Sequence, residues 1–190
     1  MSKIVAVSCS PRSDAASSRI SDAFLDGAMG LSTNIIKLHR LTSLKEIHDC
    51  NMCQNCKKVG KCTIEDDIAQ VLDDIWNADC VVFSTPVYFD GACGLYKLVE
   101  DRMESFMAEN NVSKLPKGKK ALLIVTAFNP ETKLQNISKK MSRNIEKFGF
   151  DVMGVITYCD HMGTRPVDDN PIVLQEAKKM GLTLRNTPVV

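Results

Sequence analysis

The sequence predicts an α/β fold in which a five-stranded parallel sheet is covered by helices on both faces. Two observations predict it: short apolar runs with the length of buried strands, and segments between them in which apolar residues recur at helical spacing. Strands buried on both faces read as continuous apolar runs, and strands that alternate with helices form parallel sheets. The predicted strands are 4–7, 34–38, 80–84, 121–125 and 152–158.

The first half of the chain alternates strand and helix in this way. The strand at 4–7 precedes a polar loop and a helical pattern, and the strand at 34–38 precedes a cysteine-rich loop. After that loop, Asp66 or Asp67 can cap a helix, because a carboxylate accepts hydrogen bonds from the unpaired N–H groups of the first turn. The apolar faces of these two helices are Ile20, Phe24, Ala28 and Leu31, and Ile68, Val71, Leu72, Ile75 and Trp76.

The second half continues the alternation, and proline and glycine mark its helix ends. Asn129-Pro130 and Asn170-Pro171 each predict a helix start, because proline suits the first helical position. Gly149 and Gly181 predict the ends of these two helices. The apolar faces in this half are Leu95, Leu98, Val99, Met103 and Phe106, and Leu134, Ile137, Met141, Ile145 and Phe148.

Composition limits the class of protein. The chain has 190 residues, which suffice for one domain with a sizeable core, and we treat 1–190 as that domain. A formal net charge of +1 gives no general attraction to nucleic acid or to a membrane surface. The N-terminus lacks a signal-peptide pattern, and no run reaches the roughly 18 apolar residues of a membrane span. We therefore expect a cytoplasmic protein, in which disulfides are rare.

Four cysteines lie within thirteen residues of the loop at 48–64, at Cys50, Cys53, Cys56 and Cys62. Thiolates in this C-x2-C-x2-C-x5-C array can converge on one soft metal centre, and a [4Fe-4S] cluster takes four of them. A structural zinc site also takes four thiolates, but usually as two C-x2-C pairs separated by a longer loop. The spacing therefore favours a cluster over zinc. Four ordinary thiols are the third interpretation, which the polar surroundings disfavour.

The loop after the first strand, Ser8 to Ser18, carries hydroxyl groups and one arginine. It contains neither G-x-G-x-x-G nor a Walker lysine, so the usual dinucleotide and nucleoside-triphosphate motifs are absent. Backbone N–H groups at the following helix start, serine hydroxyls and Arg12 can hold a terminal phosphate. Serine-rich helix starts are also common structural features, so this loop alone leaves both interpretations open.

The loop after the third strand, Ser84 to Gly91, is rich in proline, aromatic residues and glycine. Such residues can form a flat, partly apolar wall for a planar ring system such as isoalloxazine. A tight turn with buried aromatic side chains is the alternative. Ligands of open parallel sheets bind beyond the carboxyl ends of the strands, and both loops belong to that edge.

In their order and spacing, these motifs resemble the flavodoxin-like NAD(P)H:FMN reductase superfamily and, within it, the iron–sulfur flavoproteins. The resemblance covers essentially the whole chain. The residues that carry it are Cys9-Ser10-Pro11-Arg12, Pro86 to Phe89, the cysteine array, and Lys97, Asp101 and Arg102. It implies a flavodoxin-like three-layer sandwich with strand order 2-1-3-4-5, assembled as a homodimer or homotetramer.

The resemblance also implies which residues hold cofactors. For the phosphate of FMN these are Ser10, Arg12, Ser17 and Ser18. For its ring system they are Pro86, Val87, Tyr88, Phe89, Asp90, Gly91, Thr126 and Ala127. A [4Fe-4S] cluster, which air can destroy, would be carried by Cys50, Cys53, Cys56 and Cys62.

Several positions need separate comment. Cys9 replaces the usual glycine of the phosphate loop, and Ala16 stands where relatives often have asparagine. Lys97 and Asp101 have the i, i+4 spacing of a helical ion pair. We expect Lys97, Asp101 and Arg102 to serve a structural or subunit-contact role.

Three functional hypotheses follow. The leading one is an FMN-dependent oxidoreductase of the iron–sulfur flavoprotein type, which takes electrons from a ferredoxin-like donor and passes them to a small-molecule acceptor. The first alternative is an NAD(P)H-dependent FMN or quinone reductase without a cluster. The second is a non-enzymatic flavodoxin-like carrier or a zinc-stabilised binding module. We predict no catalytic side chain, because the cofactors carry the redox chemistry.

Overall fold

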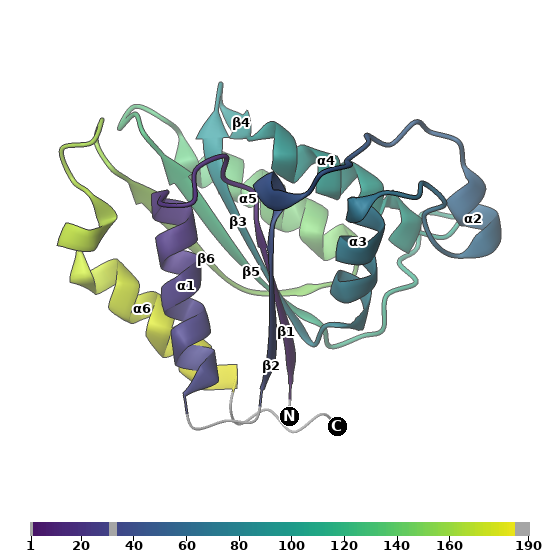
Figure 1. The fold of residues 1–190 in the computed structure, drawn as a ribbon, viewed down its shortest axis with the longest axis horizontal. Helices are drawn as coiled ribbons and strands as arrows, with labels where there is room; N and C mark the ends of the chain where they lie inside the picture. Colours follow the sequence, from purple (N-terminus) through teal and green to yellow (C-terminus); the bar gives the residue numbers. More distant parts are fainter. Residues whose placement is uncertain (1, 31–33, 185–190) are drawn as a thin grey trace.

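The computed structural model of the chain describes residues 2–30 and 34–184, which form a central sheet with helices on both faces (Figure 1). Leu31, expected on the first helix, lies outside the described residues. The strands are β1 (Lys3–Ser8), β2 (Ile35–Arg40), β3 (Cys80–Tyr88), β4 (Gly91–Ala92), β5 (Lys120–Ala127) and β6 (Asp151–Cys159). The strands β2, β1, β3, β5 and β6 lie in that order, and their neighbours pair in parallel. The α/β class and the order of the parallel strands are as predicted.

The short strand β4 was not predicted. It pairs antiparallel with the end of β3, through Val87 with Ala92 and Tyr88 with Gly91. Phe89 and Asp90 form the two-residue turn, with φ angles of 48° and 57°. Positive φ at both turn positions is the geometry that a type I′ hairpin requires. The third strand is therefore longer than the predicted 80–84, because it continues beyond the sheet edge as a hairpin.

The helices are α1 (Ala16–Met29), α2 (Asn55–Val59), α3 (Asp67–Asn77), α4 (Gly94–Arg102), α5 (Leu134–Lys147) and α6 (Pro171–Thr183), with single 3-10 turns η1 (Leu41–Ser43), η2 (Met103–Phe106) and η3 (Val167–Asp169). All of the helices except α2, which has no buried residue, pack in two layers against the sheet. One buried apolar cluster joins α1 and α6 to the sheet, and a second joins α3, α4 and α5 to its other face. In the described part of the chain, no helix has both the length and the apolar character needed to cross a membrane.

Two of the predicted helix boundaries were wrong. The helix expected from Pro130 begins at Leu134, because the carboxamide oxygen of Asn129 accepts from the N–H of Glu131 at 2.8 Å and forms a local turn instead. Gly181 does not end α6 but lies inside it, where a Cβ atom would come within 2.1 Å of the carbonyl oxygen of Phe24 on α1. The glycine therefore allows close approach of two helices.

The other boundary signals were right. Asp66 is the N-cap of α3, and its side chain accepts from the N–H of Ala69 at 3.1 Å. Pro171 occupies the first position of α6, as predicted. Gly149 follows the end of α5 with a φ of 99°, a conformation that favours glycine.

Candidate functional site

A cavity of about 300 Å³ lies at the carboxyl ends of four parallel strands. The pairs Ser8–Ser84, Pro86–Thr126 and Ala127–Cys159 bring the ends of β1, β3, β5 and β6 to one edge of the sheet. We call this the strand-end cavity. Its lining residues are Ser10, Arg12, Ala15, Ala16, Pro86, Val87, Tyr88, Thr126, Ala127, Phe128 and Asp160.

The loop between β1 and α1 presents an uncapped helix start to this cavity. The N–H of Cys9 donates to the carbonyl oxygen of Ser84 at 2.9 Å, and the N–H of Arg12 donates to Oγ of Ser10 at 3.2 Å. Among the described residues, no side chain caps α1 and its first turn holds no acidic residue. The first N–H groups of the helix and its dipole therefore favour a bound anion.

Ser17 and Ser18, in the first turn of α1, are buried and are not among the residues that line the cavity. Oγ of Ser18 lies 3.1 Å from Oγ of Ser8. Oγ of Ser17 has no hydrogen-bond partner within the described part of the chain. A buried hydroxyl without a partner is unfavourable. Ser21 and Ser84 share this property among the described residues. Because Ser17 is the one in the first turn of α1, we treat its hydroxyl as a candidate donor to an anion bound at the helix start.

The residues predicted around a ring system do not all line one cavity. Pro86, Val87 and Tyr88 line the strand-end cavity, as do Thr126 and Ala127. Phe89 is fully exposed at the tip of the hairpin. Asp90 and Gly91 line a different cavity of about 420 Å³, which lies against α4 and α5.

The sequence interpretation missed two larger lining residues, Phe128 and Asp160. Both directly follow a strand, β5 for Phe128 and β6 for Asp160. The rule that ligands bind beyond the carboxyl ends of parallel strands would have pointed to them. Their single positions carry no motif of their own, so a search by motif did not find them.

The four array cysteines, Cys50, Cys53, Cys56 and Cys62, line one small cavity in the loop at 48–64. Among residues 2–30 and 34–184, no group of three or more His, Cys, Asp or Glu side chains is close enough to hold a single metal ion. Four thiolates on one Zn²⁺, at a Zn–S distance of about 2.3 Å, must lie within roughly 4 Å of one another. In a [4Fe-4S] cluster each thiolate binds its own iron. Soft thiolates gathered around one cavity are the donor type that such a cluster takes.

Charge and burial act together on these thiols. Burial raises the pKa of Cys56, the positive charge of Lys57 opposes this effect, and the neighbouring Cys62 and Cys50 add to it. The effect of Cys62 and Cys50 on the pKa of Cys56 agrees with the place of all three around one cavity. Deprotonation of such a group is easier once a metal binds its sulfur atoms.

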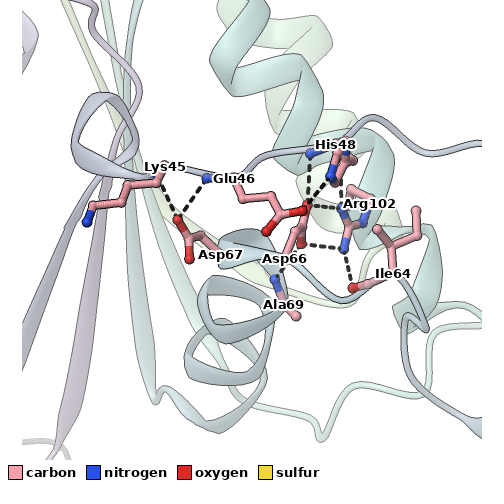
Figure 2. A network of polar contacts seen from close by, with 8 residues as sticks. All are labelled: Lys45, Glu46, His48, Ile64, Asp66, Asp67, Ala69 and Arg102. Atoms are coloured by element: carbon pink, nitrogen blue, oxygen red, sulfur yellow. Dashed lines mark hydrogen bonds and ion pairs between the residues drawn. The ribbon is translucent and has the colours of Figure 1, made fainter.

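A buried arginine closes this loop onto the body of the protein. Figure 2 shows the guanidinium of Arg102 between the carboxylate of Asp66 and the backbone of His48 and Ile64. The two Arg102–Asp66 hydrogen bonds measure 2.9 and 3.1 Å, and both side chains are 0% exposed. Burial by itself raises the pKa of Asp66, but hydrogen bonds from Arg102 and from the N–H of His48 outweigh it and lower that pKa.

The structural role that we expected for Arg102 is consistent with this position, and the contacts lie within the chain. The ion pair expected between Lys97 and Asp101 is present at 2.9 Å. Two further cations hold the cysteine loop. Nζ of Lys57 contacts the carboxylate of Glu104 and the carbonyl oxygens of Glu104 and Met107, and Nζ of Lys114 donates to the carbonyl oxygen of Gly60 at 3.1 Å.

Two of the cysteines outside the array, Cys9 and Cys80, are fully enclosed by the fold. Cys80 is buried, and burial raises its pKa to about 12. Cys9 is also buried, and burial followed by the nearby Cys93 raises its pKa well above the usual range. A thiol with a raised pKa is a poor nucleophile. Both thiols therefore fill the core, Cys9 directly after the carboxyl end of β1 and Cys80 at the amino end of β3.

Comparisons of this chain with a family model and with curated proteins agree on one family. A model described as NADPH-dependent FMN reductase matches residues 2–137. An iron–sulfur flavoprotein of Methanocaldococcus jannaschii is 32% identical over 102 residues, which cover 53% of this chain and 51% of that protein. The match thus spans about half the length of that relative. An iron–sulfur flavoprotein of Archaeoglobus fulgidus is 26% identical over 179 residues, or 94% of this chain and 77% of that protein.

Solved structures show the same fold. An FMN-dependent NADH-azoreductase from Bacillus anthracis, solved in complex with FMN, superimposes with a TM-score of 0.73. The match covers 98% of this chain and 100% of that chain at 15% identity. At this identity the likeness concerns the arrangement of strands and helices.

Proposed function

Because the chain belongs to the NADPH-dependent FMN reductase family, we propose that it is an FMN-dependent oxidoreductase of the iron–sulfur flavoprotein type. FMN would occupy the strand-end cavity, and a [4Fe-4S] cluster would bind the cysteine array. Electrons would pass between the two centres and leave for a small-molecule acceptor. The observation that carries this proposal is that all four array cysteines line one cavity in a chain that also has an uncapped helix start at its strand ends.

The FMN part of the proposal assigns roles to residues of the strand-end cavity. The N-terminus of α1, Ser10 and Arg12 would hold the phosphate, with the buried hydroxyl of Ser17 as a further donor. Pro86, Val87 and Tyr88 would form one wall against the ring system, and Thr126 and Ala127 the opposite wall. Their place at strand ends would orient the ring and limit the entry of water.

The cluster part rests on the donor set and on the names of relatives. Soft thiolates are the ligands of iron–sulfur clusters, and the relatives from Methanocaldococcus jannaschii and Archaeoglobus fulgidus are called iron–sulfur flavoproteins. A cluster exchanges one electron at a time and FMN one or two, so the pair would connect a ferredoxin-like donor to a two-electron acceptor. Two successive one-electron deliveries would balance each two-electron reduction of the acceptor.

The decisive test is a metal and cofactor analysis of protein purified without oxygen. We expect about four irons and four acid-labile sulfides per chain, the content of a [4Fe-4S] cube, together with FMN. Cys56→Ser should lower the iron content, whereas Cys159→Ser should not, because Cys159 lies outside the array on β6. Full iron content in the array variant would contradict the assignment of these ligands.

The second candidate is an NAD(P)H-dependent FMN or quinone reductase without a cluster. It is favoured by the family model, which is described as NADPH-dependent FMN reductase and matches residues 2–137. The visible spectrum of the flavin separates the two candidates. Rapid bleaching by NADPH in iron-free protein supports the cluster-free reductase, whereas bleaching by reduced ferredoxin but not by NADPH supports the iron–sulfur flavoprotein. A homodimer or homotetramer stays a prediction for either candidate.

A further inference from the structure

Arg102 makes one contact that the anchoring of the loop does not require. A guanidinium has five N–H donors, and those of Arg102 meet five acceptors. Four are the two carboxylate oxygens of Asp66 and the carbonyl oxygens of His48 and Ile64. The fifth is Sγ of Cys62, which lies 3.2 Å from Nε.

The first four contacts already close the loop at 48–64. His48 precedes the first array cysteine and Ile64 follows the last, so the guanidinium joins the two ends of the loop. Asp66 supplies the opposite charge and caps α3 through the N–H of Ala69. The contact from Nε to Cys62 adds nothing to this tether, because Cys62 is already held within two residues of Ile64.

The proposed function, on which this inference rests, gives that contact a use. We propose that Arg102 is a positioning residue that holds the sulfur of Cys62 and raises the reduction potential of the cluster bound there. Reduction by one electron makes a cluster more negative. A charge-assisted N–H donor aimed at a ligand sulfur stabilises the reduced state more than the oxidised state. The side chain is fully buried, so water does not screen the interaction.

Two substitutions separate the sulfur contact from the tether. Arg102→Lys keeps a cation opposite Asp66, but one ammonium group with three donors cannot replace the fork that also reaches Cys62. Asp66→Asn weakens the tether at the carboxylate and leaves the guanidinium beside the sulfur. Both variants are expected to melt at lower temperature than the wild type, so thermal stability alone does not distinguish them.

The distinguishing measurement is the midpoint potential of the cluster in anaerobically purified holoenzyme, from a dithionite titration followed by electron paramagnetic resonance. For Arg102→Lys we expect a potential lower by about 60 mV, the equivalent of a tenfold change in a one-electron equilibrium. For Asp66→Asn we expect no decrease, because loss of a negative charge favours the reduced state. Iron content at the wild-type level with an unchanged potential in Arg102→Lys would overturn the proposal, as would an equal decrease in both variants.

The variants can also lose iron, and that outcome is informative. Iron loss in folded Arg102→Lys but not in Asp66→Asn supports the positioning of Cys62, whereas equal loss in both leaves only a tether and overturns the proposal. A measurement on the wild type needs no variant. In protein labelled with ¹⁵N-arginine, pulsed electron paramagnetic resonance of the reduced cluster should show a coupled ¹⁵N nucleus, and its absence would contradict the contact. Wild-type protein without iron would instead refute the proposed function.

Discussion

The strand-end cavity and the cysteine loop are positioned in different ways. The walls of the cavity are residues at strand ends, and the parallel register of β1, β3, β5 and β6 sets where each one lies. The cysteine loop contains only the five-residue helix α2 as regular structure within 48–64. Its position depends on the side chains of Arg102, Lys57 and Lys114. A sheet places ligand residues through its backbone, whereas a loop needs specific charged contacts.

The largest effect that we expect is local opening of the cysteine loop in the variant Lys57→Met. The side chain of Lys57 is 7% exposed and makes three hydrogen bonds to η2 and the residue after it. Hydrogen bonds to charged groups contribute about 1.5–3 kcal/mol. Amide hydrogen exchange in residues 48–64 should therefore become roughly tenfold to a hundredfold faster, because the loop opens locally.

The matched control is Lys58→Met, whose side chain is exposed on the same helix. This substitution should change the free energy of loop opening by no more than about 0.5 kcal/mol, as for most surface substitutions. Exchange in β3 and β5 should be unchanged in both variants. If Lys57→Met accelerated exchange equally in the strands and the loop, the loop would not be an independently anchored unit.

The same difference explains what the sequence could predict. The parallel strands follow from apolar runs and helical spacing, because both reflect burial along the backbone, whereas the order of the strands came from the family resemblance. The cysteines of the array are visible in the sequence, but the side chains that anchor their loop are not, since Arg102 and Lys57 act over 36 to 54 residues of sequence separation. An arginine on a helix gives no local sign that it is buried against a distant loop.

The positions of the two turn residues of the hairpin also could not be predicted from the sequence. Phe89 and Asp90 were expected to face a ring system, yet Phe89 is exposed and Asp90 lines another cavity. The unpredicted pairing of β4 with β3 decides this, because a hairpin turns alternate residues to opposite sides. Short strands of two residues leave no periodic pattern in the sequence.

A smaller effect is expected in the strand-end cavity, from Ser17→Ala. The hydroxyl of Ser17 makes no hydrogen bond within the described residues, so its loss should not destabilise the FMN-free protein. If it donates to a bound phosphate, FMN affinity should fall about tenfold, or about 1.4 kcal/mol. Fluorescence titration with FMN and thermal melting of the FMN-free protein measure the two quantities.

Ser18→Ala is the contrasting variant. Its hydroxyl pairs with that of Ser8, so the FMN-free protein should lose about 1 kcal/mol of stability. Unchanged FMN affinity in Ser17→Ala would remove Ser17 from the phosphate site. The phosphate of FMN would then be held by the N–H groups of α1, by Ser10 and by Arg12.

The smallest effect on stability is expected at the hairpin tip, from a substitution of Phe89. This substitution tests whether Phe89 serves folding or binding. Phe89 adopts a φ of 48°, which is strained for a bulky side chain and ordinary for asparagine. Phe89→Asn should therefore raise the free energy of unfolding by roughly 0.5–1 kcal/mol, since no buried contact is lost from a fully exposed ring. Because the exposed ring makes no buried contact, a use outside folding would account for a phenylalanine at this strained position. If the variant is more stable but binds FMN less tightly, or associates less, the ring of Phe89 contributes to FMN binding or to subunit contact. A loss of stability would mean that the ring packs within its own chain.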